Sequence, residues 1–358
     1  MKRIWKPGFD FIRTVIAIGI AILLALIIIL CTSEEPLEAL RYFIVGPLTN
    51  VRRMGNVIEA MLPLLFTGLA VCLIARTKVF NLASEGAFFL GGTAAALCAV
   101  LLELPPVILP IVCILAGGLA GVAVILIPAA LRMKYDASEI VSSLMLNYVA
   151  LYFGLFLIRT FVRNPESGEL QSLEFRSAAV LPRIVPRTRI HLGLIVAAVC
   201  VVAAYFFLFR SRSGYKVRMA GENPRFARYS GIKIVSSILL AQAVAGLIAG
   251  IGGASEMLGM FTRFKWPGLP GYGWDGIIVA TLARNNPANV VWGALFLAYM
   301  RVGADIMCRM TDMQNEVVSI IQGVVIILVV ADGFLAAWRK RIVFREATAA
   351  SLEGGKAE

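Results

Sequence analysis

Long apolar runs alternate with short polar segments along nearly the whole chain. A helix crosses the hydrocarbon layer of a bilayer, roughly 30 Å thick, with roughly 20 apolar residues. The pattern predicts ten spans, near residues 12–31, 57–75, 86–102, 107–131, 139–160, 191–209, 234–252, 275–284, 289–303 and 316–336. The sequence therefore predicts an all-α integral membrane protein. Residues 1–345 are expected to form a single transmembrane domain, and residues 346–358 a short polar tail.

Two segments interrupt this pattern with polar residues and glycines at membrane depth, near residues 76–86 and 266–276. Irregular backbone survives there only where protein buries it or where it lines a wet cavity, because lipid offers no hydrogen-bond partners. Each break ends in an acid followed by glycine, Glu85-Gly86 and Asp275-Gly276, and then enters a predicted span. In the predicted topology these two spans run in opposite directions. We therefore expect two inverted five-helix halves with broken or re-entrant segments near a solute pathway.

Glu85 and Asp275 each fit two interpretations. An acid at the positive N-terminal end of a helix is a capping residue, which contributes about 0.5–2 kcal/mol. An acid at bilayer depth is also costly and is kept there mainly for a function. The same choice applies to amides within or beside spans, which either join helices by hydrogen bonds or contact a solute. The candidate pathway residues are Asn81, Glu85, Asn147, Gln242 and Asp275.

Other features of the spans predict packing alone. Arg301 and Asp305 are four residues apart and are expected to form an ion pair along one helix. Small residues spaced by four let helices approach closely. Two such pairs are Gly117 with Gly121 and Gly246 with Gly250.

The connection from Arg210 to Lys233 predicts a short amphipathic helix near its end. Asn223 suits the N-cap, Pro224 the first helical position, and Gly231 the stop. So short a helix is unstable alone in water, so it must lie on the lipid surface or in a groove of a partner protein. The candidate contact residues are Glu222, Asn223, Pro224, Arg225, Phe226, Ala227, Arg228, Tyr229 and Gly231.

Composition narrows the class of protein. With 59% hydrophobic residues, 16% charged residues and a mean hydropathy of +0.83, the chain fits a membrane rather than a soluble fold. The net charge of +12 is spread between apolar runs, so no nucleic-acid partner is expected. Most Lys and Arg residues fall on the side that carries both predicted termini, which the positive-inside rule assigns to the cytoplasm.

The sequence offers no chemistry of a familiar enzyme. It lacks GxxxxGK[ST], HExxH and GxSxG motifs, and its six cysteines show no CxxC spacing. The only histidine, His191, is expected as an interfacial residue at the outer end of a span. We therefore predict no catalytic site, no metal site, no disulfide framework and no cofactor in this chain.

Four segments resemble the permease subunits of bacterial ABC importers for branched-chain amino acids, simple sugars and nucleosides, above all the nucleoside permeases served by basic membrane lipoprotein-type receptors. They are RTKVFNLASEGAFFLGG (76–92), SEIVSSLMLNYVALY (138–152), GYKVRMAGENPRFARYSGI (214–232) and GYGWDGIIVATLARNNP (271–287). The resemblance implies a separate cytoplasmic ATPase that binds ATP, a second permease subunit and an extracytoplasmic solute-binding lipoprotein. It also implies the bacterial cytoplasmic membrane, and it makes the 222–233 helix the coupling helix that docks into the ATPase.

The solute is the open question. The family usually has FNIGxEGQ where this chain has FNLASEGA, with Ala83 and Ala87 in place of glycine and glutamine. A purine-type nucleoside is the first expectation, and a simple sugar or a flavin-like vitamin is the alternative. An ion-coupled secondary transporter is the rival from another class, because inverted repeats and broken spans occur there too.

Overall fold

The computed structural model describes residues 35–311, 320 and 323. The predicted spans near 12–31 and 316–336 and the tail at 346–358 lie outside the described residues. The chain divides into a compact unit of residues 47–302 and a second unit formed by residues 1–46 and 303–358. The candidate site lies in the first unit.

Helices make up all the regular elements of the described residues. The compact unit of residues 47–302 holds α3 (Val51–Arg76), α4 (Ser84–Leu101), α5 (Ile108–Tyr135), α6 (Glu139–Phe161), α7 (Gly193–Tyr205) with the π-helical η2 (Phe206–Arg210), α8 (Arg212–Glu222), α9 (Pro224–Tyr229), α10 (Ile234–Met260) and α11 (Tyr272–Leu282). In the second unit, the first described helix is α2 (Pro36–Ile44). Two elements include a boundary between the units: the 3-10 turn η1 (Gly46–Leu48) and helix α12 (Pro287–Met310).

Seven helices of the described residues are long and apolar enough to cross a membrane: α3, α4, α5, α6, α7 with η2, α10 and α12. They correspond to seven of the predicted spans. The predicted crossing at 275–284 is not confirmed, because α11 has only 11 residues. At about 1.5 Å per residue it is roughly half as long as the bilayer core is thick. The total of ten crossings and the two inverted halves remain predictions.

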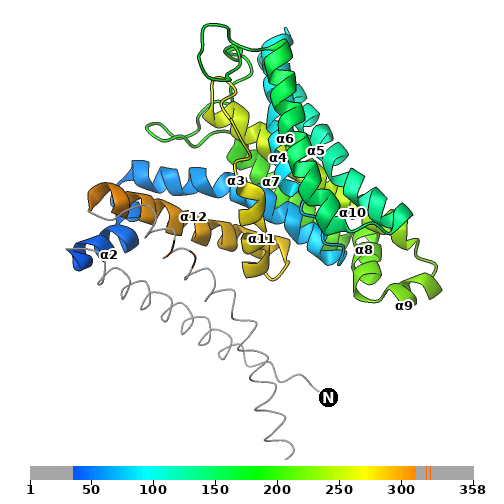
Figure 1. The fold of residues 1–358 in the computed structure, drawn as a ribbon. Coiled ribbons are helices and arrows are strands. Elements are labelled where there is room, and N and C mark those ends of the chain that lie inside the picture. The colour runs from blue at the N-terminus through cyan, green and yellow to red at the C-terminus, as the bar shows by residue number, and fades with distance from the viewer. Residues whose placement is uncertain (1–34, 312–319, 321–322, 324–358) are drawn as a thin grey trace, which may run out of the picture. The chain divides into compact units, whose positions relative to one another are not determined.

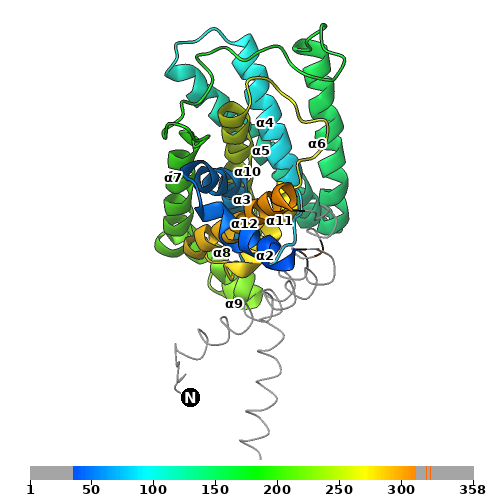
Figure 2. The ribbon, with the colours of Figure 1, turned by 90° about the vertical axis from the view of Figure 1, so that its left-hand side faces the viewer.

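Helices α4, α5 and α10 pack through glycines, and α6 lies beside α4 and α5 (Figures 1 and 2). A Cβ added to Gly117 of α5 would lie 2.7 Å from Gly91 O of α4 and 3.1 Å from Gly250 O of α10. Gly121 and Gly246 face one another in the same way. The predicted close packing at these glycines is confirmed.

Replacing Gly250 by valine should therefore destabilise the helix bundle. The new Cβ would meet the backbone of Gly117 and Gly118, which cannot rotate aside as a side chain can. Overpacking typically costs about 1–3 kcal/mol, and a backbone obstacle places this variant at the upper end. We expect a lower melting temperature and a smaller monodisperse fraction in detergent. Gly168→Val is the control, since nothing lies within 4 Å of a Cβ there; equal losses in both variants would contradict the packing argument.

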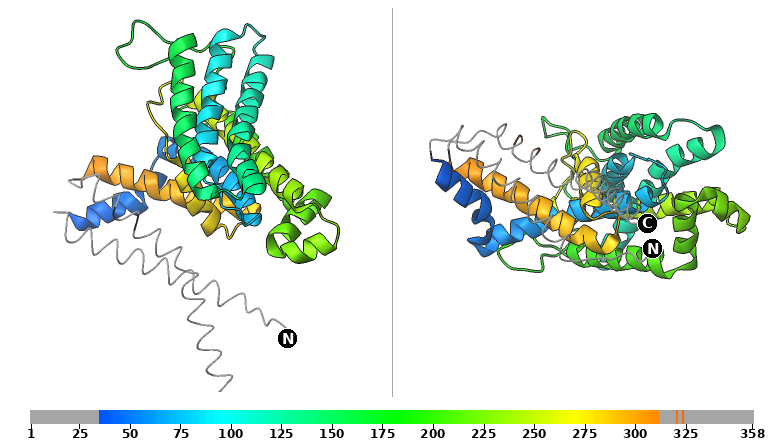
Figure 3. Two further views of the ribbon diagram at one scale, coloured as in Figure 1. Left: turned by 45° about the vertical axis from the view of Figure 1, so that its right-hand side comes forward. Right: turned by 90° about the horizontal axis from the view of Figure 1, so that it is seen from below.

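Helix α3 is the most buried of the candidate spans, with 83% of its apolar window inside the protein. It crosses the bundle and packs against α10 and α11 (Figure 1). Helices α8 and α9 lie at one end of the bundle and the 162–192 connection at the other (Figure 3). Helix α8 contacts both α3 and α10, and the 162–192 connection contacts the end of α10 through the bond of Leu181 N to Leu258 O.

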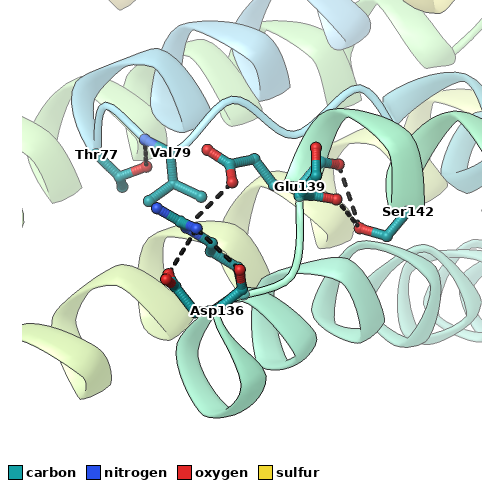
Figure 4. Close-up of polar contacts among 7 residues, drawn as sticks. Thr77, Val79, Asp136, Glu139 and Ser142 are labelled. Carbon is teal, nitrogen blue, oxygen red and sulfur yellow. Dashed lines mark hydrogen bonds and ion pairs between the residues drawn. The ribbon is translucent and has the colours of Figure 1, made fainter.

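The turn between α5 and α6 is fixed by surface ion pairs (Figure 4). Asp136 ends α5 with a φ of 52°, and Arg132 pairs with Asp136 at 2.6 Å and with Glu139 at 3.1 Å. Exposed pairs of this kind contribute roughly 0–1 kcal/mol. They shape this turn but supply no binding site.

Candidate functional site

The two breaks of the sequence contact one another through Glu85. The backbone N–H of Gly271 donates to Glu85 Oε1 at 2.6 Å, and the N–H of Gly273 donates to Oε2. Gly271 has a φ of 85°, and a Cβ on Gly273 would lie 2.6 Å from Glu85 Cα, so both positions require glycine. The carboxylate thus lies at the positive N-terminal end of α11. Glu85 is a capping residue, but it caps α11 and not its own helix α4.

Helix α6 holds the first break in place. Asn147 Nδ2 donates to Leu82 O at 3.0 Å, and its Oδ1 accepts from Gly86 N at 2.9 Å. Ser143 Oγ accepts from Leu82 N at 3.0 Å. These bonds satisfy backbone groups that the irregular segment leaves outside helices α3 and α4. Asn147 therefore joins helices, as an amide in a bundle often does.

Asn81 and Gln242 form a second tie. Asn81 Nδ2 donates to Gln242 Oε1 at 3.1 Å and to Ile125 O at 3.0 Å, and its Oδ1 accepts from Ala83 N at 3.0 Å. Gln242 is fully buried in α10, and its amide nitrogen lies 3.5 Å from Thr77 Oγ1. The end of α3, the first break and α10 are thereby connected.

Asp275 pairs with Arg301 of α12 at 2.6 Å. The predicted pair between Arg301 and Asp305 is wrong, because Asp305 instead pairs with Arg309 at 2.9 Å. Spacing along the chain detects partners on one helix only. A buried carboxylate on a neighbouring helix offers Arg301 a less hydrated partner than the exposed Asp305 does.

All five candidate pathway residues therefore lie around the two breaks, and each has a polar partner in the protein. All five join segments that are far apart in sequence: Asn81, Glu85, Asn147, Gln242 and Asp275. The arrangement holds irregular backbone rigidly inside an apolar bundle. Contact of these residues with a solute remains a prediction.

The sequence reasoning missed two acids, Glu59 of α3 and Glu256 of α10. Glu256 is 6% exposed, and one carboxylate oxygen of each residue is buried without a hydrogen-bond partner among the described residues. The predicted span at 234–252 ended too early, since α10 continues to Met260 and includes Glu256. The apolar residues Met257 and Leu258, which follow Glu256, could have indicated that the helix continues beyond this acid.

His191 is not an interfacial residue, contrary to the prediction. It is 1% exposed, and its ring lies against Gly259 of α10. Gly193 N donates to its Nδ1 at 3.1 Å. Burial lowers the pKa of His191 to about 4, so the imidazole is neutral at physiological pH.

The predicted short helix is confirmed as α9. Asn223 Oδ1 accepts from Phe226 N at 3.1 Å, Pro224 occupies the first turn, and Gly231 has a φ of 74° just after the end. Tyr229 is 93% exposed and Phe226 is 50% exposed, so the described residues leave Tyr229 almost uncovered and cover half of Phe226. Glu222 belongs to the preceding helix α8, which the sequence reasoning did not predict.

Helix α8 ties α9 to the bundle. Ser211 caps it by accepting from Gly214 N at 2.9 Å. Gly221 lies against the carbonyl of Arg76, where α3 ends. Arg76 Nε in turn donates to Asn285 O at 2.7 Å. Helix α8 therefore connects α9 to the end of α3, next to Thr77 and the first break.

Comparison with known proteins assigns the class. Residues 53–330 match the family described as branched-chain amino acid transport system / permease component. The chain belongs to this family. It is a multi-pass membrane permease of the ABC transporter type and not an enzyme.

Three relatives show the range of the family. The chain is 33% identical to the glucose ABC transporter permease protein TsgB13 of Haloferax volcanii, over 87% of this chain and 85% of the relative. It is 31% identical to the guanosine ABC transporter permease protein NupP of Bacillus subtilis, over 80% and 83%. It is 25% identical to the nucleoside ABC transporter permease protein NupB of Lactococcus lactis, over 88% and 89%.

Proposed function

We propose that the chain is the membrane-spanning subunit of an ATP-driven importer for a small polar solute. A purine-type nucleoside is the first choice, supported by the guanosine and nucleoside permeases among its relatives. A simple sugar is the second candidate, favoured by the relative that carries glucose. Nucleosides and sugars share a neutral ring that bears several hydroxyl groups.

The observation that carries the ATP-driven part of this proposal is the aromatic face of α9. Two exposed aromatic side chains on a short capped helix suit a groove on a partner protein, because burying them removes apolar surface from water. The chain has no phosphate-binding loop of its own. A separate cytoplasmic ATPase would supply ATP, and α9 with the end of α8 would be its contact.

The other partners follow from the same proposal. A second permease subunit would complete the passage, and an extracytoplasmic solute-binding lipoprotein would deliver the solute. The assembly would lie in the bacterial cytoplasmic membrane among its lipids, with both termini of this chain in the cytoplasm. The α9 end of the unit then faces the cytoplasm, and the 162–192 connection faces outward.

The proposed passage runs along the seam marked by Asn81, Glu85, Asn147, Gln242 and Asp275. These residues tie α3, α4, α6, α10, α11 and α12 at the two breaks. Closure of the ATPase would move α9 and α8, and the contact of Gly221 with Arg76 would pass this motion to α3. The seam is where such a motion would change access from one side to the other.

Uptake driven by ATP tests the proposal. The full transporter, with ATPase and binding protein, is placed in vesicles with labelled guanosine, glucose or riboflavin. We expect guanosine uptake that requires internal ATP and is unchanged when proton and sodium gradients are dissipated. Uptake that follows an ion gradient without ATP would instead support a secondary transporter.

A further inference from the structure

Buried polar atoms without partners gather at one place in the bundle. Among the described residues, five such side-chain atoms occur, and four belong to Glu59, His191, Ser255 and Glu256. The fifth is the Nε of Arg218 in α8. A buried polar group without a partner is costly and uncommon in folded proteins. Four together on facing elements mark a place where a bound water or a ligand would complete the hydrogen bonds.

These residues surround the outward half of the contact between α3 and α10. Glu59 and Glu256 are close enough for their charges to interact, and Tyr272 at the start of α11 lies within electrostatic range of both. The guanidinium nearest to Glu59 is that of Arg189, at 3.9 Å and largely exposed. No ion pair of Glu256 occurs among the described residues. Glu59 is paired only with an arginine that is largely exposed.

His191 and Ser255 add a donor and a hydroxyl to the same region. His191 Nδ1 accepts from Gly193 N, so the neutral imidazole carries its proton on Nε2, the atom without a partner. The His191 ring lies against Gly259, which is one helical turn beyond Ser255 in α10. The ring and the Ser255 side chain both lie close to Gly193. Together the four side chains present two carboxylate oxygens, one N–H donor and one hydroxyl.

This set of groups selects among ligand classes. An anionic solute finds no buried cation beside these two acids among the described residues. The proton on His191 Nε2 occupies the position that a metal ion would need, and the described residues hold no group of three metal-binding side chains. Hydroxyl groups fit, because each donates to a carboxylate oxygen and accepts from an N–H. A ring with several hydroxyls would use both capacities at once.

We propose that Glu59 and Glu256, with His191 and Ser255, bind the hydroxyl groups of a neutral sugar ring during passage. For a nucleoside this ring is the ribose, and for a sugar it is the pyranose. The inference rests on the proposed function and names the part of the solute that the bundle recognises. Tyr272, which lies within electrostatic range of both acids, stands in the chain between the two glycines that bind Glu85.

The variant Glu256→Gln tests the inference, because it should weaken the preference for a solute that has ribose hydroxyl groups over one that lacks them. Uptake of guanosine and of 2′,3′-dideoxyguanosine is compared in vesicles that contain the full transporter. We expect the wild type to prefer guanosine by about tenfold or more, and Glu256→Gln to reduce this preference to about threefold or less, because the carboxamide replaces one of the acid oxygens available to the hydroxyl groups with an NH2 group. The binding protein is the same for both forms, so its own preference cancels in the ratio.

Two further variants keep the test decisive. Glu59→Gln should also reduce the preference and gives the result if Glu256→Gln fails to assemble. Glu174→Gln is the matched control, since Glu174 pairs with Arg263 at 3.8 Å as Glu59 does with Arg189, but is largely exposed. Its preference should equal that of the wild type.

The outcomes separate the inference from the proposed function. Guanosine uptake with an unchanged preference in both variants would overturn the inference and leave the importer intact. A wild type that takes up guanosine and 2′,3′-dideoxyguanosine equally well would overturn the inference as well. Failure of the wild type to take up guanosine or glucose would count against the proposed function itself.

Discussion

Replacing Phe226 and Tyr229 with glutamate is expected to abolish co-purification of the ATPase and to reduce uptake at least tenfold. Both side chains are exposed on α9, and the buried Ala227 between them fixes the helix against the bundle. An apolar groove that accepts two aromatic rings would have to bury two charges instead, which costs several kcal/mol. The amount of ATPase retained on the tagged permease measures the effect, together with ATP-dependent uptake.

Membrane insertion of this double variant should be normal, because neither side chain supports the fold. Tyr135→Glu is the matched control: Tyr135 is 67% exposed at the end of α5, on the same end of the bundle, but lies outside α8 and α9. It should retain the ATPase. Co-purification of the ATPase with the double variant at normal yield would contradict the coupling role of α9.

Much of the fold could be predicted from the apolar pattern, because each spanning helix must be long and apolar by itself. The seven helices that are long and apolar enough to cross a membrane lie at predicted positions, and the close glycine packing of α5 on α10 was predicted as well. Helix α9 was predictable because Asn223, Pro224 and Gly231 act on their own local backbone. Local rules fix local structure, so these features are visible in one sequence.

Contacts between distant segments could not be predicted in this way. Glu85 caps α11 rather than α4, and Arg301 pairs with Asp275 rather than Asp305. Both results depend on which helices become neighbours, and chain spacing does not contain that information. Glu256 was missed for a related reason: whether an acid near the end of an apolar run is exposed or buried depends on the loop that covers it.

The bond between the two breaks leads to the second large effect. Glu85→Ala removes the acceptor of two N–H groups, the partly buried one of Gly271 and the buried one of Gly273, and leaves the start of α11 without its acidic partner. A hydrogen bond to a charged group contributes about 1.5–3 kcal/mol, and a buried donor without a partner costs about 1–3 kcal/mol. We expect at least a tenfold loss of ATP-dependent uptake and a lower melting temperature in detergent.

The ATPase should still co-purify with Glu85→Ala, which distinguishes this variant from the α9 double variant. Glu85→Gln should lie between wild type and alanine, since its carboxamide keeps one acceptor but turns an NH2 toward the other N–H. Glu139→Gln is the control, because Glu139 also lies in a first helical turn but pairs with Arg132 near the surface. Uptake and melting temperature of Glu85→Ala equal to those of this control would show that the two breaks hold their positions without Glu85. The bonds of Glu85 would then not be needed for the proposed seam between α4 and α11.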